Sequence, residues 1–196
     1  MNYFNSVGVA QTLNNDLPGA PGGDVEIASI ITINDGLHMN ISHQNHGMYF
    51  TNNSVILSEV KSDIKPTTLT AAYPADSTSG ITVGLGATFA TFENVGVGTT
   101  NVGLLLIGDE IIEYTDVTGN TIGGNIVRGP NPKTYPAGTP VFKYEMGGVS
   151  LNRINRTHSL SDVTESDPFT FDSYKVKLDM SATTGTARNT DVGFPC

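Results

Sequence analysis

Hydrophobic and polar residues alternate along several short segments of the chain. Between positions 25 and 33 most odd-numbered residues are Val or Ile, and the turn sequence Asn34-Asp35-Gly36 follows. A side-chain period of two is typical of a β-strand that buries one face. The same pattern predicts strands over residues 54–60 and 174–180.

The last of these strands has an irregularity in its pattern. Phe169 and Phe171 lie at odd positions, whereas Tyr174 and Val176 lie at even ones. Both pairs can face one core only if an extra residue shifts the strand between them. The sequence therefore predicts a β-bulge near Asp172-Ser173.

Residues 102–114 carry the clearest hairpin signal. Two apolar runs, 104–107 and 110–114, are separated by Gly108-Asp109. Glycine adopts the positive φ that a tight primed turn needs, so we expect a two-residue turn here. Thr118-Gly119-Asn120 predicts a second turn, which leads into a strand over 121–127.

Proline and glycine limit what the rest of the chain can form. Segment 128–140 contains four prolines, which exclude a central strand, and residues 141–144 resume the alternation. The stretch between Gly148 and Pro168 is free of both residue types but lacks the apolar stripe of a helix. We therefore expect almost no helix.

These elements predict an all-β protein with a discontinuous, β-sandwich-like outer domain. Residues 1–23, rich in Asn, Gly and Pro, are expected to form an N-terminal arm or linker. Residues 24–65 and 145–196 would form the outer domain, and residues 66–144 an inserted small β-barrel-like module. The turn-like pairs Lys65-Pro66 and Gly147-Gly148 mark the predicted points of insertion.

Composition and charge exclude two classes of partner, nucleic acids and membranes. The 196 residues include 22 Gly and 10 Pro, and only 15% are charged, against roughly 25% in most soluble domains. The net charge of −9 would repel a phosphate backbone, so we expect no nucleic-acid partner. The longest apolar run, residues 104–107, is too short for a bilayer, so we expect no membrane insertion.

Histidine provides the one candidate metal site. His38, His43 and His46 lie within nine residues and could reach one ion from a loop, although Asp35 is the nearest carboxylate that could complete a zinc site. The alternative is that these histidines are polar turn residues. We predict no cofactor.

Other patterns do not predict catalysis. Segment 96–101 begins like a phosphate-binding glycine loop but ends in Asn101, and a connection between strands is the simpler interpretation. Glu110 and Glu113 have opposite parity on an extended strand, which places them on different faces. The one cysteine, Cys196, is the last residue, and no nucleophile elbow occurs. We therefore predict that the chain is not an enzyme and has no catalytic residues.

Several glycine-and-strand motifs in the middle of the chain occur together. They lie at 107–115, 119–121, 128–129 and 137–141, and Asn45-His46-Gly47-Met48 and the strand at 169–180 accompany them. This combination resembles a module of virion structural proteins from tailed phages. It is most similar to very large tail- or baseplate-associated proteins of contractile-tailed phages that infect marine cyanobacteria, and the resemblance covers most of residues 24–195.

The resemblance implies a non-enzymatic structural component of a phage tail, baseplate or fibre. Its partners would be other virion proteins or copies of itself, and its location would be the virion, assembled in the host cytoplasm. The resemblance and the end at Gly193-Phe194-Pro195-Cys196 also imply a piece of a longer chain.

Two other function classes compete with this hypothesis. A module that binds host surface glycans is suggested by four aromatic residues near predicted loops, Tyr49, Phe50, Tyr73 and Tyr135. The absence of Trp weakens this alternative, because flat sugar faces favour large aromatic platforms. A polysaccharide hydrolase would need two carboxylates facing one groove.

Overall fold

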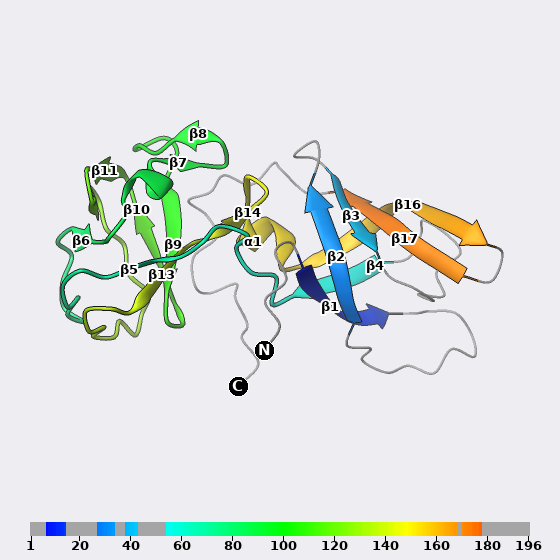
Figure 1. Ribbon diagram of the computed structural model, residues 1–196, viewed down its shortest axis with the longest axis horizontal. Helices are drawn as coiled ribbons and strands as arrows, with labels where there is room; N and C mark the ends of the chain where they lie inside the picture. Colours follow the sequence, from blue (N-terminus) through cyan, green and yellow to red (C-terminus); the bar gives the residue numbers. More distant parts are fainter. Residues whose placement is uncertain (1–6, 15–26, 34–37, 43–53, 168–169, 178–196) are drawn as a thin grey trace. The chain divides into compact units, whose positions relative to one another are not determined.

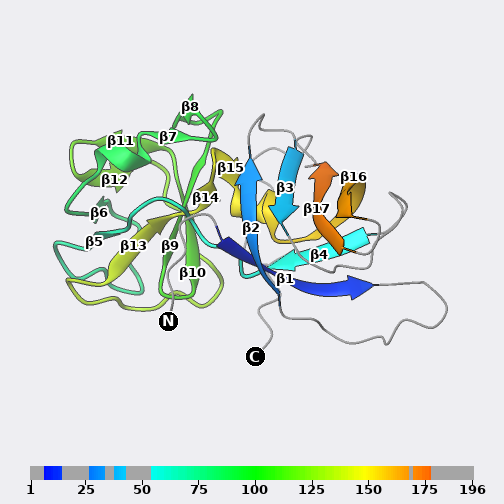
Figure 2. The ribbon, with the colours of Figure 1, turned by 45° about the vertical axis from the view of Figure 1, so that its right-hand side comes forward.

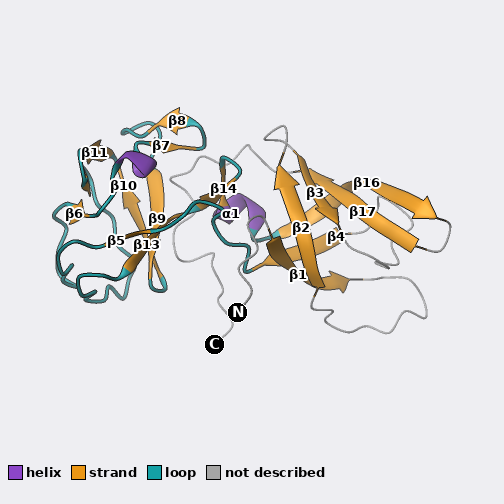
Figure 3. Cartoon of the chain, in the orientation of Figure 1, coloured by secondary structure: helices purple, strands orange, loops and turns teal. Residues whose placement is uncertain are grey.

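The chain folds almost entirely as antiparallel strands. The structure is a computed structural model, and it describes residues 7–14, 27–33, 38–42, 54–167 and 170–177. Strands make up 46% and helices 6%, which confirms the all-β class (Figure 3).

The chain is divided into two compact units (Figure 1). The barrel unit comprises Met1–Asp63 and Leu151–Ser181, and the middle unit comprises Ile64–Ser150 and Ala182–Cys196. Strand residues 7–14 thus belong with the barrel unit, and residues 145–150 with the middle unit.

The barrel unit is a closed antiparallel barrel of six strands (Figure 2). Around the barrel the order is β1-β2-β3-β17-β16-β4. The bounds are β1 Val7–Asn14, β2 Ile27–Ile33, β3 His38–Ser42, β4 Ser54–Ser58, β16 Thr157–Asp167 and β17 Thr170–Lys177. Buried side chains at alternate positions, Met39, Ile41, Val55 and Leu57, show the predicted period of two.

Strand β1 corrects the prediction for residues 1–23. That segment was expected to be an arm, but Val7–Asn14 pairs with β2 on one side and with β4 on the other. These two pairings close the sheet, so the outer strands form a barrel in place of a sandwich-like arrangement. The prediction was wrong because it followed the many turn-forming residues of 14–23. The alternation of Val7 and Val9 is too short to indicate a strand by itself.

The β-bulge predicted near Asp172-Ser173 is confirmed. Thr164 pairs with Ser173, whereas its neighbour Glu165 pairs with Phe171, so Asp172 has no partner in the register. The extra residue shifts the strand by one position, as the change of parity required. Residues 178–180 of the predicted strand lie outside the described part.

One asparagine, which follows a short helix, joins two segments of the barrel unit that are far apart in the sequence. Helix α1 (Leu151–Ile154) leads into β16. The Asn155 side chain accepts a hydrogen bond from the Val60 N–H (2.9 Å) and donates one to the Val60 carbonyl (3.1 Å). This reciprocal pair fixes the segment after β4 beside the segment before β16.

The middle unit consists of small antiparallel sheets. Its four-stranded sheet has the order β10-β9-β13-β5, and a three-stranded sheet has the order β11-β12-β6. The pairs β7-β8 and β14-β15 complete it. The bounds are β5 Thr67–Thr68, β6 Ile81–Thr82, β7 Thr91–Phe92, β8 Val95–Gly96, β9 Gly103–Ile107, β10 Glu110–Tyr114, β11 Asp116–Thr118, β12 Thr121–Gly123, β13 Pro140–Lys143, β14 Glu145–Met146 and β15 Val149–Ser150, with a 3-10 turn at Ala87–Phe89.

Both predicted hairpin turns are confirmed. Ile107 pairs with Glu110, and Thr118 pairs with Thr121, so each turn has two residues. Gly108 has φ +61° and Gly119 has φ +59°, while the second residue of each turn has no positive φ. Glycine at the first position only is the type II′ pattern, which matches the twist of the flanking strands.

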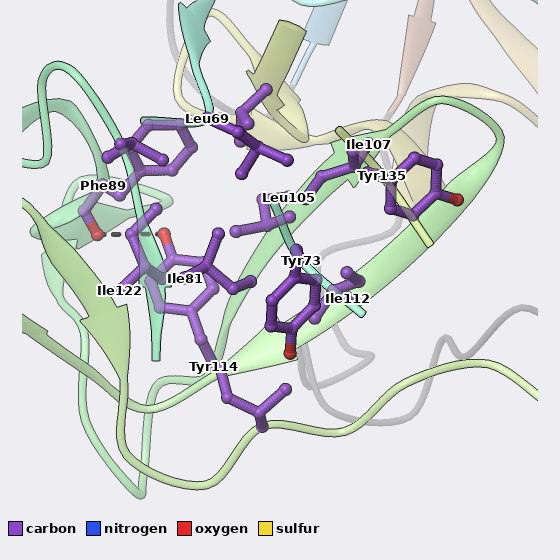
Figure 4. Packing of buried hydrophobic residues seen from close by; sticks show 13 residues of the cluster. Leu69, Tyr73, Ile81, Phe89, Leu105, Ile107, Ile112, Tyr114, Ile122 and Tyr135 are labelled. Atoms are coloured by element: carbon purple, nitrogen blue, oxygen red, sulfur yellow. Dashed lines mark hydrogen bonds between the residues drawn. The ribbon is translucent and has the colours of Figure 1, made fainter. Parts of the chain in front are cut away.

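Aromatic and aliphatic side chains from several of these sheets form one core in the middle unit (Figure 4). Tyr114 lies fully buried in it and donates a hydrogen bond to the Phe89 carbonyl (2.9 Å). The two rings meet edge to face, with centroids 6.3 Å apart. This geometry satisfies the buried phenol and links the 3-10 turn to β10.

Gly103 gives a direct test of this packing. It pairs with Tyr114, and a Cβ atom there would lie 2.2 Å from the Tyr114 ring. We expect Gly103→Ala to lower the free energy of unfolding by about 2–3 kcal/mol, because the ring must shift in a filled core. Gly98→Ala is the matched control, since a Cβ atom there meets nothing within 4 Å. Equal stabilities of the two variants in urea unfolding would contradict this packing.

Buried tyrosines predict the response to alkaline pH. Burial raises the pKa of Tyr144 to about 12, and burial together with the charge of Glu145 raises the pKa of Tyr114. In the unfolded chain tyrosine ionises near pH 10. The folded state therefore keeps protons that the unfolded state releases, so the stability contributed by these groups is complete below about pH 10 and is lost as the pH rises towards 12.

We expect the free energy of unfolding to fall by about 1.4 kcal/mol per pH unit for each such tyrosine over this interval. Urea unfolding at a series of alkaline pH values measures the slope. Tyr144→Phe should reduce it, and an unchanged slope in that variant would show that Tyr144 ionises normally in the fold.

Candidate functional site

Only one of the three candidate histidines lies in the part of the chain that the structure describes. His38 lies on β3 and is half-buried, whereas His43 and His46 lie outside the described residues. Among the residues that the structure describes, no group of three or more His, Cys, Asp and Glu side chains could hold a metal ion. The histidine metal site therefore stays a prediction.

Arg128 forms hydrogen bonds with several separate parts of the middle unit. Its guanidinium forms a two-pronged pair with the Glu110 carboxylate, with Nε–Oε1 at 2.8 Å and Nη2–Oε2 at 2.7 Å. Both side chains are buried, with 6% and 5% of their surface exposed. A planar guanidinium matches a carboxylate in this geometry, which makes the pair both strong and directional.

Arg128 also binds the backbone of two separate loops. Nη1 donates to the carbonyls of Pro74 (2.5 Å) and Ala75 (3.0 Å), and Nη2 donates to the carbonyl of Lys133 (2.7 Å). Loop 74–79 and the proline-rich loop 129–139 are thereby attached to one side chain, which Glu110 anchors to β10.

Two tyrosines complete the arrangement around Arg128. The guanidinium lies over the Tyr73 ring, 4.6 Å from its centroid. Tyr73 and Tyr135 exchange backbone hydrogen bonds of 2.8 and 2.9 Å, which join the two loops as a bridge. Stacking and backbone pairing thus add to the hydrogen bonds of the guanidinium.

These tyrosines correct part of the glycan hypothesis. Tyr73 and Tyr135 were candidates for an exposed sugar platform, but they have only 3% and 7% of their surface exposed and belong to the core. Both take part in the bridge that joins the two loops, and both rings pack in the core of the middle unit. Tyr49 and Phe50, the other two candidates, lie outside the described residues.

The environment of Arg128 favours the charged form of its guanidinium and the neutral form of Tyr135. Burial by itself lowers the pKa of Arg128, but the hydrogen bonds and charge of Glu110 outweigh burial and raise it. Burial raises the pKa of Tyr135, and the charge of Glu110 raises it further. Arg128 therefore stays protonated as the permanent counter-ion of Glu110.

A second buried polar cluster lies at the β7-β8 hairpin. Lys143 Nζ and Glu145 Oε1 are 2.5 Å apart, and both side chains are buried. The other Glu145 oxygen accepts the Glu93 N–H (2.8 Å), and the Glu93 carboxylate accepts the Ser150 N–H (2.9 Å). Glu93 and Asn94 both have positive φ, at 50° and 63°. These bonds hold a turn in which Glu93 adopts a positive φ that is uncommon for a residue of its type, whereas Asn tolerates it.

The glycine-rich segment 96–101 is a connection between strands. The Asn101 side-chain amide donates to the carbonyls of Phe92 (2.9 Å), Val95 (3.1 Å) and Gly96 (3.3 Å). The asparagine thus organises backbone acceptors of the preceding hairpin.

Charge is scarce on the exposed surface of residues 64–150. The exposed residues with charged side chains there are Lys65, Asp76, Asp109, Asp116 and Lys133. Thr, Gly, Ala, Pro and Asn make up most of the rest, whereas soluble surfaces usually carry about 25–35% charged residues. Lys133 and Asp109 further neutralise each other, with Nζ and Oδ2 2.5 Å apart.

Sequence reasoning missed Arg128 altogether. Glu110 was considered only as one of a pair of acids with Glu113, yet each is buried on β10 and Glu110 is occupied by Arg128. The available signal was an arginine directly before a loop of several prolines. Arg128, Glu110, Lys143 and Glu145 act chemically as internal cross-links between loops and strands.

Comparison with protein-family models, with curated proteins and with solved structures gives no match. In the described part of the chain, no helix has the length and apolar character needed to span a membrane.

Substitution of Arg128 tests its role as a cross-link. Arg128→Met leaves Glu110 buried without its counter-ion and removes the bonds to both loops, so we expect a loss of about 3–5 kcal/mol in the free energy of unfolding. The matched control is Lys133→Met, which breaks an exposed pair and should cost at most about 1 kcal/mol. Urea unfolding followed by near-ultraviolet circular dichroism compares the two, and equal losses would refute the role of Arg128.

Proposed function

We propose that this chain is a non-enzymatic structural component of a phage tail, baseplate or fibre, and that it acts through protein–protein contacts. Its partners are other virion proteins or copies of itself, and it resides in the virion after assembly in the host cytoplasm. The observation that carries the proposal is the exposed surface of residues 64–150, which has few charged side chains, while two ion pairs of the same unit are buried.

Such a surface suits permanent contacts with other proteins. The centres of protein interfaces are depleted of charged residues, because each charge would lose its hydration there. Loops fixed by Arg128 and by the Tyr73–Tyr135 bridge already have their bound conformation, so association orders few additional residues. The sequence motifs at 107–115 and 137–141, which resemble those of virion structural proteins, support a role in a phage particle.

Analysis of purified particles of the phage that encodes this sequence tests the proposal. We expect mass spectrometry to find peptides from 64–150 in gradient-purified virions, and immunogold labelling with antibodies against this segment to mark the tail. Absence from intact particles would overturn the proposal. Selective binding on a glycan array, without incorporation into particles, would instead favour a host-glycan-binding module.

A further inference from the structure

The middle unit interrupts one pairing of the barrel. Strands β4 and β16 pair in antiparallel fashion, yet residues 64–150 separate them in the sequence. Beyond the ends of both strands, the Leu57 N–H donates to the Arg156 carbonyl (3.1 Å), and the Asn155 side chain bonds to both backbone groups of Val60. We call these three hydrogen bonds the stem. The stem joins residues that are as much as 95 positions apart.

A second pairing brings together two segments near the ends of the middle unit. Thr67 of β5 lies opposite Val141 of β13, and Thr68 lies opposite Pro140. This pairing is nested inside the stem, because positions 67 and 141 both lie between positions 60 and 155. A folded middle unit therefore shortens the loop that the stem closes, from 95 positions to roughly 20.

The last two strands of the barrel depend on this loop. Strand β16 pairs with β4, and β17 pairs with β3, so each of these pairings joins a strand before the middle unit to a strand after it. Strands β16 and β17 also pair with each other. Attachment of these two strands to the strands β1–β4 therefore closes a loop that contains the whole middle unit.

We propose that the folded middle unit acts as the turn that closes the barrel, so that the stabilities of the two units are coupled. The equilibrium constant for closing a flexible loop falls with about the 3/2 power of the loop length. Shortening the loop from 95 positions to roughly 20 therefore favours attachment of β16 and β17 by about tenfold. Unfolding of the middle unit removes this advantage and weakens the barrel at the stem.

The coupling is reciprocal, as the linkage of two equilibria requires. A closed barrel holds both connections to the middle unit near each other and favours folding of that unit by the same factor. A protein that binds only the folded middle unit would therefore also strengthen the attachment of β16 and β17. The chain connections are sufficient to transmit such an event from one unit to the other, and the inference does not depend on the proposed function.

Hydrogen exchange at the stem tests the coupling. The Leu57 and Val60 amides donate across the stem and report its opening. Urea is set where the β9-β10 hairpin of Arg128→Met has unfolded and that of the unaltered chain has not. Both stem amides should then exchange at least about tenfold faster in the variant. The control Lys133→Met, which breaks an exposed pair of the same unit, should leave their exchange unchanged. Equal exchange of the stem amides in Arg128→Met and in the unaltered chain would overturn the coupling.

A flexible insertion tests whether the coupling depends on loop length. About 20 Gly and Ser residues between Lys65 and Pro66, both exposed, double the length of the connection while the middle unit stays folded. We expect the stem amides to exchange about threefold faster, by the same length dependence. The matched control places the same insertion between Thr99 and Thr100, which lies inside the nested pairing, and should cause no change. Equal exchange of the stem amides in the two insertion variants would show that loop closure is not the cause.

Discussion

The middle unit depends on one buried ion pair, Arg128 with Glu110. A carboxylate in the first position of β10 loses its hydration on folding, and the guanidinium compensates for this with two parallel hydrogen bonds. The remaining donors of Arg128 reach carbonyls in loops 74–79 and 129–139. Long connections without secondary structure thereby become fixed parts of the fold.

The same principle operates at the other buried charges. Glu145 neutralises Lys143 and also accepts the N–H of Glu93, so that one carboxylate supports both an ion pair and the turn between β7 and β8. Asn101 and Asn155 likewise join separate segments, because their neutral side-chain amides donate hydrogen bonds to backbone carbonyls. Polar side chains thus connect segments that are far apart in the sequence, and small, uncharged residues make up most of the exposed surface of residues 64–150.

Local signals in the sequence were sufficient for much of the fold. Gly108 and Gly119 occupy the turn positions that require positive φ, and the parity change between Phe171 and Tyr174 located the bulge at Asp172. Strand β1 was missed because its alternation is short and the following Asn- and Pro-rich residues dominate the segment. Closure of the barrel depends on the pairing of β1 with β4, a long-range contact that no local pattern contains.

The candidate site was less predictable for a similar reason. Arg128 and Glu110 are 18 positions apart, and their pairing depends on how β10 and the proline-rich loop come together in space. Tyr73 and Tyr135 lay near loops in the sequence, yet they form a backbone bridge and both rings are buried in the core. Proximity to a loop therefore did not distinguish an exposed aromatic residue from one that anchors its loop.

The central claim is that Arg128 makes loops 74–79 and 129–139 rigid parts of the middle unit. Hydrogen exchange of individual backbone amides in the unaltered chain measures this most directly. The amides of Tyr73 and Tyr135, which bond to each other's carbonyls, should exchange as slowly as those in the β9-β10 hairpin. Exchange of these two amides at the rate of unstructured peptides, with the hairpin protected, would contradict the account.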